Sequence, residues 1–201
     1  IHKTMFVFVA VLALFLLKEK LNKWLITGMS LLLIGTYLMI RPEFVFSIGH
    51  LLVLGAVLFW AFENIIAKKA LTDLSGNIVG WGRMFFGSIF IFIFLLFTGK
   101  SGIIFGMNSQ QYLWVLLTSV LLFLYVITYY NGLKHISVTT ATAILALGQP
   151  ITSIVSWAYG SAILGVYDIF GIALMIIGVI MMLWCVSISK FFSKIRSGHY
   201  G

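Results

Sequence analysis

The sequence predicts an all-α, polytopic transmembrane helical bundle, on the evidence of its composition, its apolar stretches and an internal repeat. The chain is 62% hydrophobic and only 9% charged, whereas soluble domains are about 45–50% apolar. Most of its seven apolar stretches approach the about 20 residues that cross about 30 Å of hydrocarbon. These predicted spans are 4–18, 24–40, 50–67, 77–98, 111–131, 138–163 and 167–189. The first two are short, and we expect the charged segment between them at a membrane surface.

The sequence of the second predicted span recurs, with weak similarity, in the seventh predicted span. Residues 24–40 recur 143 residues later at 167–183, and two glycine pairs carry most of the match: Gly28 with Gly35, and Gly171 with Gly178. The glycines of each pair are seven residues apart, about two helical turns, so both lie on a face that another helix can approach closely. The copies are five spans apart, an odd number, so they are predicted to cross the membrane in opposite directions. Inverted repeats of this kind are typical of transporters.

The basic residues are distributed unevenly between the two sides that alternating spans define. One side receives nine of them: Lys18, Lys20, Lys23, Lys68, Lys69, Lys134, Lys190, Lys194 and Arg196. The other side receives Lys3, Arg41 and Lys100, while Arg83 lies within a span. Short loops rich in Lys and Arg mark the cytoplasmic face, so the basic tail 190–201 is expected inside the cell, near anionic headgroups. The net charge of +8 therefore reflects topology and does not indicate a nucleic-acid partner.

The same topology places Ile1 outside the cell, just ahead of a span and without an initiator methionine. The chain also holds the end of one repeat followed by a whole second repeat. We therefore expect a sequence truncated at its front, from an intact protein of ten spans with both ends in the cytoplasm. The single Cys185 excludes an intramolecular disulfide and any multi-cysteine metal site, and we expect neither a metal nor another cofactor.

Several loose patterns occur in the chain in a consistent order. A charged hinge, Leu17–Lys18–Glu19–Lys20–Leu21, precedes the first glycine pair, and further along the chain come Trp60, Lys69, Arg83, Ala141–Leu145 and Gln149–Pro150. In these features the chain resembles the EamA family of the drug/metabolite transporter superfamily. Residues 1–42 resemble the last two helices of a first EamA repeat, and 46–189 resemble a complete second repeat of five helices. The resemblance implies a ten-helix inner-membrane permease with two inverted repeats (5+5) around a central cavity, and no enzyme.

The acidic hinge of this pattern is present in only one copy of the repeat. Glu19 precedes Gly28 by nine residues, whereas the equivalent position before Gly171 is Ala162. Because Glu19 is surrounded by lysines at the predicted cytoplasmic surface, we expect local ion pairing or a solvated helix cap. The loss of the acid in the second copy therefore casts little doubt on transport.

Glu63 is the only carboxylate well inside a predicted span, about 9 Å along the helix from Lys69. Arg83 lies at a similar depth in the next, antiparallel span, and two interpretations stay open. In one, Glu63 and Arg83 neutralise each other and hold two helices together. In the other, Glu63 faces the cavity with Asn64 and exchanges a proton or binds a cationic solute. Trp60, three residues before Glu63, would then offer cation–π contact to an amine.

The sixth span carries the broadest polar stripe, on one helical face. Its candidate cavity residues are Thr142, Gln149, Thr152, Ser153 and Ser156. Pro150 cannot donate a hydrogen bond to the carbonyl of Ala146, and Gly148 precedes it, so we predict a kink. Broken helices of this kind line transporter sites, whereas tight packing of small residues is the alternative interpretation.

The fifth span adds tyrosines near its cytoplasmic end. Tyr125 is the deepest of them and the best candidate for contact with a ligand. Tyr129 and Tyr130 lie nearer the interface, where an aromatic belt explains them.

These features predict a secondary transporter, a permease or exporter, that moves small polar or amphipathic metabolites by alternating access. The chain has no Walker motif, so a proton gradient or the solute's own gradient would drive transport. Two alternatives are a membrane-embedded lipid-modifying enzyme and a non-transporting membrane assembly protein. The first is disfavoured because all four histidines, His2, His50, His135 and His199, lie at span ends or in the tail. The oligomeric state is left open.

Overall fold

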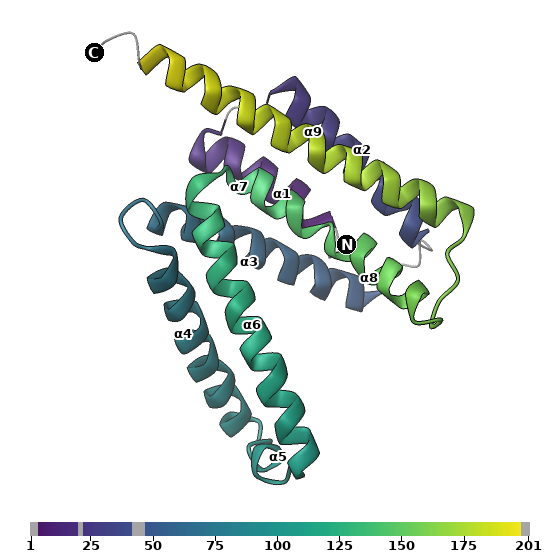
Figure 1. The fold of residues 1–201 in the computed structure, drawn as a ribbon. Coiled ribbons are helices and arrows are strands. Elements are labelled where there is room, and N and C mark those ends of the chain that lie inside the picture. Colours follow the sequence, from purple (N-terminus) through teal and green to yellow (C-terminus); the bar gives the residue numbers. More distant parts are fainter. Residues whose placement is uncertain (1–3, 20–21, 42–46, 198–201) are drawn as a thin grey trace. The chain divides into compact units, whose positions relative to one another are not determined.

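The computed structural model of the protein describes residues 4–19, 22–41 and 47–197, with side chains up to residue 184. Within these ranges every regular element is a helix, which confirms the all-α prediction (Figure 1). The elements are α1 (Met5–Leu12), the π-helix η2 (Ala13–Leu17), α2 (Lys23–Ile40), α3 (Ile48–Ala70), α4 (Gly76–Phe97), α5 (Gly102–Phe105), α6 (Ser109–His135), α7 (Val138–Leu145), α8 (Gly148–Ala158) and α9 (Val166–Ser197).

Six of the seven predicted spans are long and apolar enough to cross a membrane. They are Lys23–Ile40, Ile48–Ala70, Gly76–Phe97, Ser109–His135, Val138–Ala158 and Val166–Trp184. The first apolar stretch forms the shorter helix Met5–Leu17, which at 1.5 Å per residue reaches only about 20 Å. Its helix ends where Lys18 adopts a left-handed backbone conformation with φ of 54°. The structure thus supports six spans, and a seventh at 4–18 stays a prediction.

The last helix continues beyond its apolar part to Ser197. The predicted basic tail 190–201 is therefore helical over 190–197, with its side chains and all of 198–201 outside the described residues.

The chain forms two compact units. One comprises residues 1–66 and 136–201, and the other comprises residues 67–135. The first unit contains the two copies of the repeat, and the second is built around the hairpin of α4 and α6.

The two copies of the repeat, α2 and α9, pack along each other in the first unit (Figure 1). A Cβ built on Gly35 would lie 2.7 Å from the carbonyl oxygen of Gly171, and one on Gly28 would lie 2.7 Å from that of Gly178. The first glycine of each helix therefore faces the second glycine of the other, so the helices are antiparallel. The sequence predicted opposite directions for the two copies, and for these two helices the prediction is confirmed.

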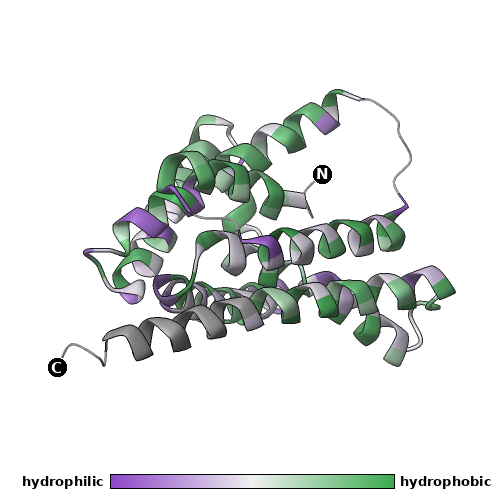
Figure 2. Cartoon of the chain, turned by 90° about the horizontal axis from the view of Figure 1, so that it is seen from above, coloured by the Kyte–Doolittle hydropathy of each residue, from purple (hydrophilic) through white to green (hydrophobic). Residues whose placement is uncertain are grey.

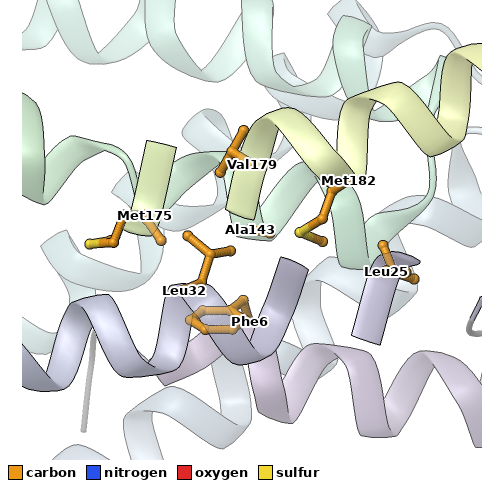
Figure 3. Packing of buried hydrophobic residues seen from close by; sticks show 8 residues of the cluster. Phe6, Leu25, Leu32, Ala143, Met175, Val179 and Met182 are labelled. Carbon is orange, nitrogen blue, oxygen red and sulfur yellow. The ribbon is translucent and has the colours of Figure 1, made fainter. Parts of the chain in front are cut away.

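Apolar side chains complete the contact around the glycines. Figure 3 shows Leu32 of α2 beside Met175, Val179 and Met182 of α9. The whole buried cluster consists of Phe6, Leu25, Leu32, Ala143, Ala146, Met175, Val179 and Met182. In a bilayer the lipid tails are as apolar as these side chains, so close packing rather than escape from solvent holds the helices together.

The hairpin of α4 and α6 is closed at one end by a glycine contact and by polar bonds. A Cβ on Gly76 would lie 2.6 Å from the backbone nitrogen of Asn131, and Asn131 Nδ2 donates to Asn77 Oδ1 at 2.7 Å. Lys68 Nζ donates to the carbonyl oxygen of Leu133 at 2.7 Å, in the last turn of α6. A cation at this position satisfies a terminal carbonyl and complements the helix dipole.

Most apolar side chains of the second unit point outward. Only 6% of the apolar window is buried in α4 and in α6, compared with 44% in Val138–Ala158. Figure 2 shows hydrophobic residues along most of the helix lengths. Soluble proteins rarely expose continuous apolar surface of this extent, which the hydrocarbon of a membrane readily solvates.

Candidate functional site

A break interrupts the span that carries the predicted polar stripe. Helix α7 ends at Leu145 and α8 begins at Gly148, so the helix is interrupted just before Pro150, where the sequence predicts a kink. Across the break the hydrogen bonds span three residues rather than four: the nitrogens of Ala146 and Gln149 donate to the oxygens of Ala143 and Ala146 at 3.0 and 3.2 Å. Because Pro150 has no N–H, it cannot restore the regular bond to Ala146.

Gln149 lies directly at this break and is half-buried. Its Oε1 atom is inaccessible and has no hydrogen-bond partner among the described residues. A buried acceptor without a donor is unfavourable by about 1–3 kcal/mol, so Gln149 Oε1 is a candidate to accept a hydrogen bond from a solute or a water molecule. Ser153 and Ser156 follow on the same face, and both are half-buried.

The threonines of the stripe use their hydroxyl hydrogens within their own helices. Thr142 is 2% exposed and donates to the carbonyl of Val138 at 2.9 Å. Thr152 is exposed and donates to the carbonyl of Gly148 at 2.7 Å. Thr142 thus packs within the helix bundle, whereas Thr152 lies beside the face of Gln149.

The three candidates on α3 lie within one turn. Asn64 is fully buried, and its Nδ2 donates to the carbonyl of Trp60 at 2.8 Å and lies 3.5 Å from Glu63 Oε2. The side chains of Trp60 and Glu63 are half-buried. Asn64 therefore stabilises its own helix and orients the neighbouring carboxylate, a role that the sequence did not suggest.

Arg83 belongs to α4, in the second unit. Its hydrogen-bond partner was not predicted from the sequence. Its Nη1 donates to the phenol oxygen of Tyr130 on α6 at 2.9 Å. Glu63 belongs to the other unit, and the proposed ion pair of Glu63 with Arg83 stays a prediction.

Three tyrosines form a continuous series along α6. The ring of Tyr125 stacks on that of Tyr129 with centroids 6.0 Å apart, and Tyr129 meets Tyr130 edge to face at 5.4 Å. Tyr130 is fully buried, so it is part of the hairpin packing rather than of an exposed aromatic belt.

Glu19 has a longer-range role than the expected surface ion pairing. Its Oε1 accepts a hydrogen bond from the backbone nitrogen of Val138 at 2.8 Å, and its Oε2 accepts one from Thr139 Oγ1 at 2.8 Å. Ser137 accepts from the nitrogen of Thr140 at 3.2 Å. Together the two side chains cap the start of α7. Glu19 does cap a helix, as the sequence suggested. The capped helix is α7, which begins more than a hundred residues further along the chain.

The fold and this site define a multi-pass helical membrane protein with one interrupted span. Comparison with known sequences identifies its relatives. The chain belongs to the EamA-like transporter family, whose sequence pattern matches residues 47–184.

Two curated relatives carry transporter names. The "Uncharacterized transporter YyaM" of Bacillus subtilis is 26% identical over 199 residues, which cover 94% of this chain and 64% of that protein. An "Uncharacterized transporter" of Clostridium kluyveri is 26% identical over 184 residues, which cover 87% of this chain and 59% of that protein. The chain thus spans less than two thirds of either relative. No solved structure gives a significant match.

Proposed function

We propose that the chain contributes to a secondary transporter that moves small polar or amphipathic metabolites by alternating access. The break between α7 and α8 is the observation that carries this proposal, because it sets the buried acceptor Gln149 Oε1 at an irregular point of a membrane span. Irregular backbone at membrane depth is tolerated where protein or a water-filled cavity surrounds it. A solute N–H or O–H group that donates to Gln149 would satisfy the acceptor.

The antiparallel contact of α2 with α9 supports the mechanism. Alternating access in inverted-repeat transporters moves one repeat against the other around a fixed site. In the contact of α2 with α9, equivalent glycines of the two copies face each other. This reciprocal contact is compatible with two inverted repeats that move against each other. The candidate solute contacts are Trp60, Glu63, Asn64, Tyr125, Thr142, Gln149, Thr152, Ser153 and Ser156.

The proposal also covers location and energy source. The nine-to-three bias of basic residues supports an inner-membrane protein with a cytoplasmic C-terminus. Glu63 is the proposed group for proton coupling. No enzymatic step is assigned to the protein.

Flux through liposomes containing the purified protein tests this proposal. The solutes are labelled amino acids, nucleosides and an organic cation. Gln149→Leu is expected to lower flux about tenfold or more, because the loss of one buried hydrogen bond to a polar solute is of that order. Gln110→Leu, at the exposed start of α6, is the matched control and should transport normally.

The other outcomes separate the alternatives. Equal flux in wild type and Gln149→Leu would overturn the assignment of the site. Turnover of the liposome lipids without solute flux would favour a lipid-modifying enzyme. The absence of both would favour an assembly protein.

A further inference from the structure

Lysines gather at the end of the α4–α6 hairpin where α6 finishes. Lys68 and Lys69 lie in the last turn of α3, and Lys134 lies in the last turn of α6. Lys68 Nζ donates to the carbonyl oxygens of Leu133 and Lys134 at 2.7 and 3.3 Å, which joins the two helix ends. Lys69 and Lys134 are both exposed. Two exposed cations are therefore held at one end of the hairpin.

The ammonium group of Lys134 lies at the start of α4. Its Nζ donates to the carbonyl oxygen of Leu74 at 3.1 Å, just ahead of that helix. This is the one hydrogen bond of the group within the described residues, and an ammonium has three N–H donors, so two are available to a ligand. Asp73 is the only carboxylate among residues 67–135, so it offsets at most one of the cations.

An exposed apolar face of α4 begins beside this ammonium. Ile78, Trp81 and Phe85 recur at i, i+3 and i+7, so they share one side of the helix. The rings of Trp81 and Phe85 stack with centroids 4.8 Å apart, and the three side chains are between 45 and 55% exposed. Leu74, whose carbonyl holds Lys134, is 41% exposed just ahead of them. A cation thus lies at the head of an apolar stripe.

We infer that this end of the hairpin binds an anionic phospholipid. The headgroup phosphate accepts hydrogen bonds from Lys134 and is attracted by Lys69, and an acyl chain lies along Ile78, Trp81 and Phe85. Basic residues at the ends of membrane spans attract anionic headgroups, by about fivefold in affinity for each cation. The apolar stripe favours a lipid over a soluble phosphate compound, which would leave the stripe unmatched. The inference goes beyond the proposed transport function and does not depend on it.

Native mass spectrometry of the purified protein tests the inference. The protein in detergent is titrated with dioleoylphosphatidylglycerol or with dioleoylphosphatidylcholine, which carry the same acyl chains. We expect the anionic phosphatidylglycerol to bind about tenfold or more tightly than the zwitterionic phosphatidylcholine, because two cations contribute to the difference.

Substitutions assign the preference to this end of the hairpin. Lys69→Gln and Lys134→Gln should each weaken phosphatidylglycerol binding about fivefold and leave phosphatidylcholine nearly unaffected. The matched control is Lys100→Gln, which removes an exposed lysine just before α5, at the opposite end of the same hairpin (Figure 1). That variant should keep the full preference. Trp81→Ala should weaken both lipids alike, because it removes a contact with the acyl chain.

Two further measurements separate a lipid headgroup from other anions. Asp73→Asn removes the nearby negative charge and should tighten phosphatidylglycerol binding, whereas weaker binding would count against the charge attraction. Glycerol 3-phosphate carries the phosphate without acyl chains and should not displace the lipid. Displacement would overturn the lipid assignment in favour of a soluble phosphate compound.

Two other results would overturn the inference: equal affinity of the wild type for both lipids, or an unchanged preference in folded Lys69→Gln and Lys134→Gln. Circular dichroism and thermal unfolding verify that each variant is folded. The side chain of Lys69 makes no hydrogen bond within the described residues. Lys69→Gln should therefore fold even if loss of the bond from Lys134 to Leu74 destabilises the hairpin.

Discussion

A Cβ on Gly28 would lie 2.7 Å from the carbonyl oxygen of Gly178, and a Cβ on Gly178 would lie the same distance, 2.7 Å, from the carbonyl oxygen of Gly28. The methionines around the contact are also reciprocal. A Cβ on Gly28 would meet Met182 Cγ at 2.5 Å, and one on Gly171 would meet Met39 Cγ at 2.5 Å. The two copies of the repeat therefore bind each other through the same surface, as in an isologous dimer interface.

Gly28→Ala is expected to destabilise the protein by about 1–3 kcal/mol, the usual range for overpacking. The added methyl group would press on a backbone oxygen of α9, which no change of rotamer can move away. Thermal unfolding in detergent measures the effect.

The control is Gly87→Ala in α4, where a Cβ would meet nothing within 4 Å. There the better helix propensity of alanine should stabilise by about 0.5–1 kcal/mol. Equal losses in both variants would contradict the contact.

The reciprocity of the contact predicts which second substitution rescues which glycine variant. Met182→Ala should recover part of the loss caused by Gly28→Ala and none of that caused by Gly171→Ala, because only Gly28 faces Met182. Met39→Ala should show the reverse pattern. Double-mutant cycles on thermal unfolding measure these couplings. Rescue of both glycine variants by either methionine substitution would argue against the two-fold relation.

The glycine faces were predictable because spacing alone fixes which side of a helix a residue occupies. Gly28 and Gly35, seven residues apart, had to share a face. Their partner was not predictable, since any helix with small residues could have met that face. The break near Pro150 was predictable for a similar reason: the missing N–H is a property of the residue itself.

The interactions that could not be predicted join residues that are far apart in the sequence. Glu19 is surrounded by lysines, and nothing local points to its bonds with Val138 and Thr139. From the sequence, Tyr130 was assigned to the aromatic belt at the membrane interface. Gly80 of α4 could have indicated that another helix approaches closely there, and in the structure Tyr130 packs beside it. The apolar stretch 4–18 has a span-like composition and forms the helix Met5–Leu17, and whether it crosses the membrane stays a prediction.

Glu19→Ala should weaken the start of α7 by about 1 kcal/mol, since loss of a helix cap is unfavourable by about 0.5–2 kcal/mol. Hydrogen–deuterium exchange at Val138, whose amide donates to Glu19, should rise about fivefold. The control is Asp73→Asn, which changes an exposed carboxylate in the turn before α4. Unchanged protection at Val138 would exclude the capping role.

Pro150→Ala should restore a regular helix between α7 and α8. The new N–H can donate to the carbonyl of Ala146, which in the wild type accepts from Gln149 at 3.2 Å. We expect a higher unfolding temperature together with a several-fold loss of flux. Ile151→Ala, a change at an exposed neighbour, keeps the break and should transport normally. A stabilised variant with full flux would show that the break is not part of the transport site.

Glu63→Gln separates the two interpretations of this carboxylate. If Glu63 exchanges a proton with the solute, the variant should lose uptake driven by a pH gradient but keep solute exchange at equal pH, because the amide carries no titrating proton. If Glu63 instead neutralises Arg83, the variant should lose about 3–5 kcal/mol of stability, with any remaining flux responding to the gradient as before. Paired measurements of flux and thermal unfolding distinguish these outcomes, with Asp73→Asn as the control. Gradient-driven uptake that persists unchanged would leave Glu63 without a coupling role.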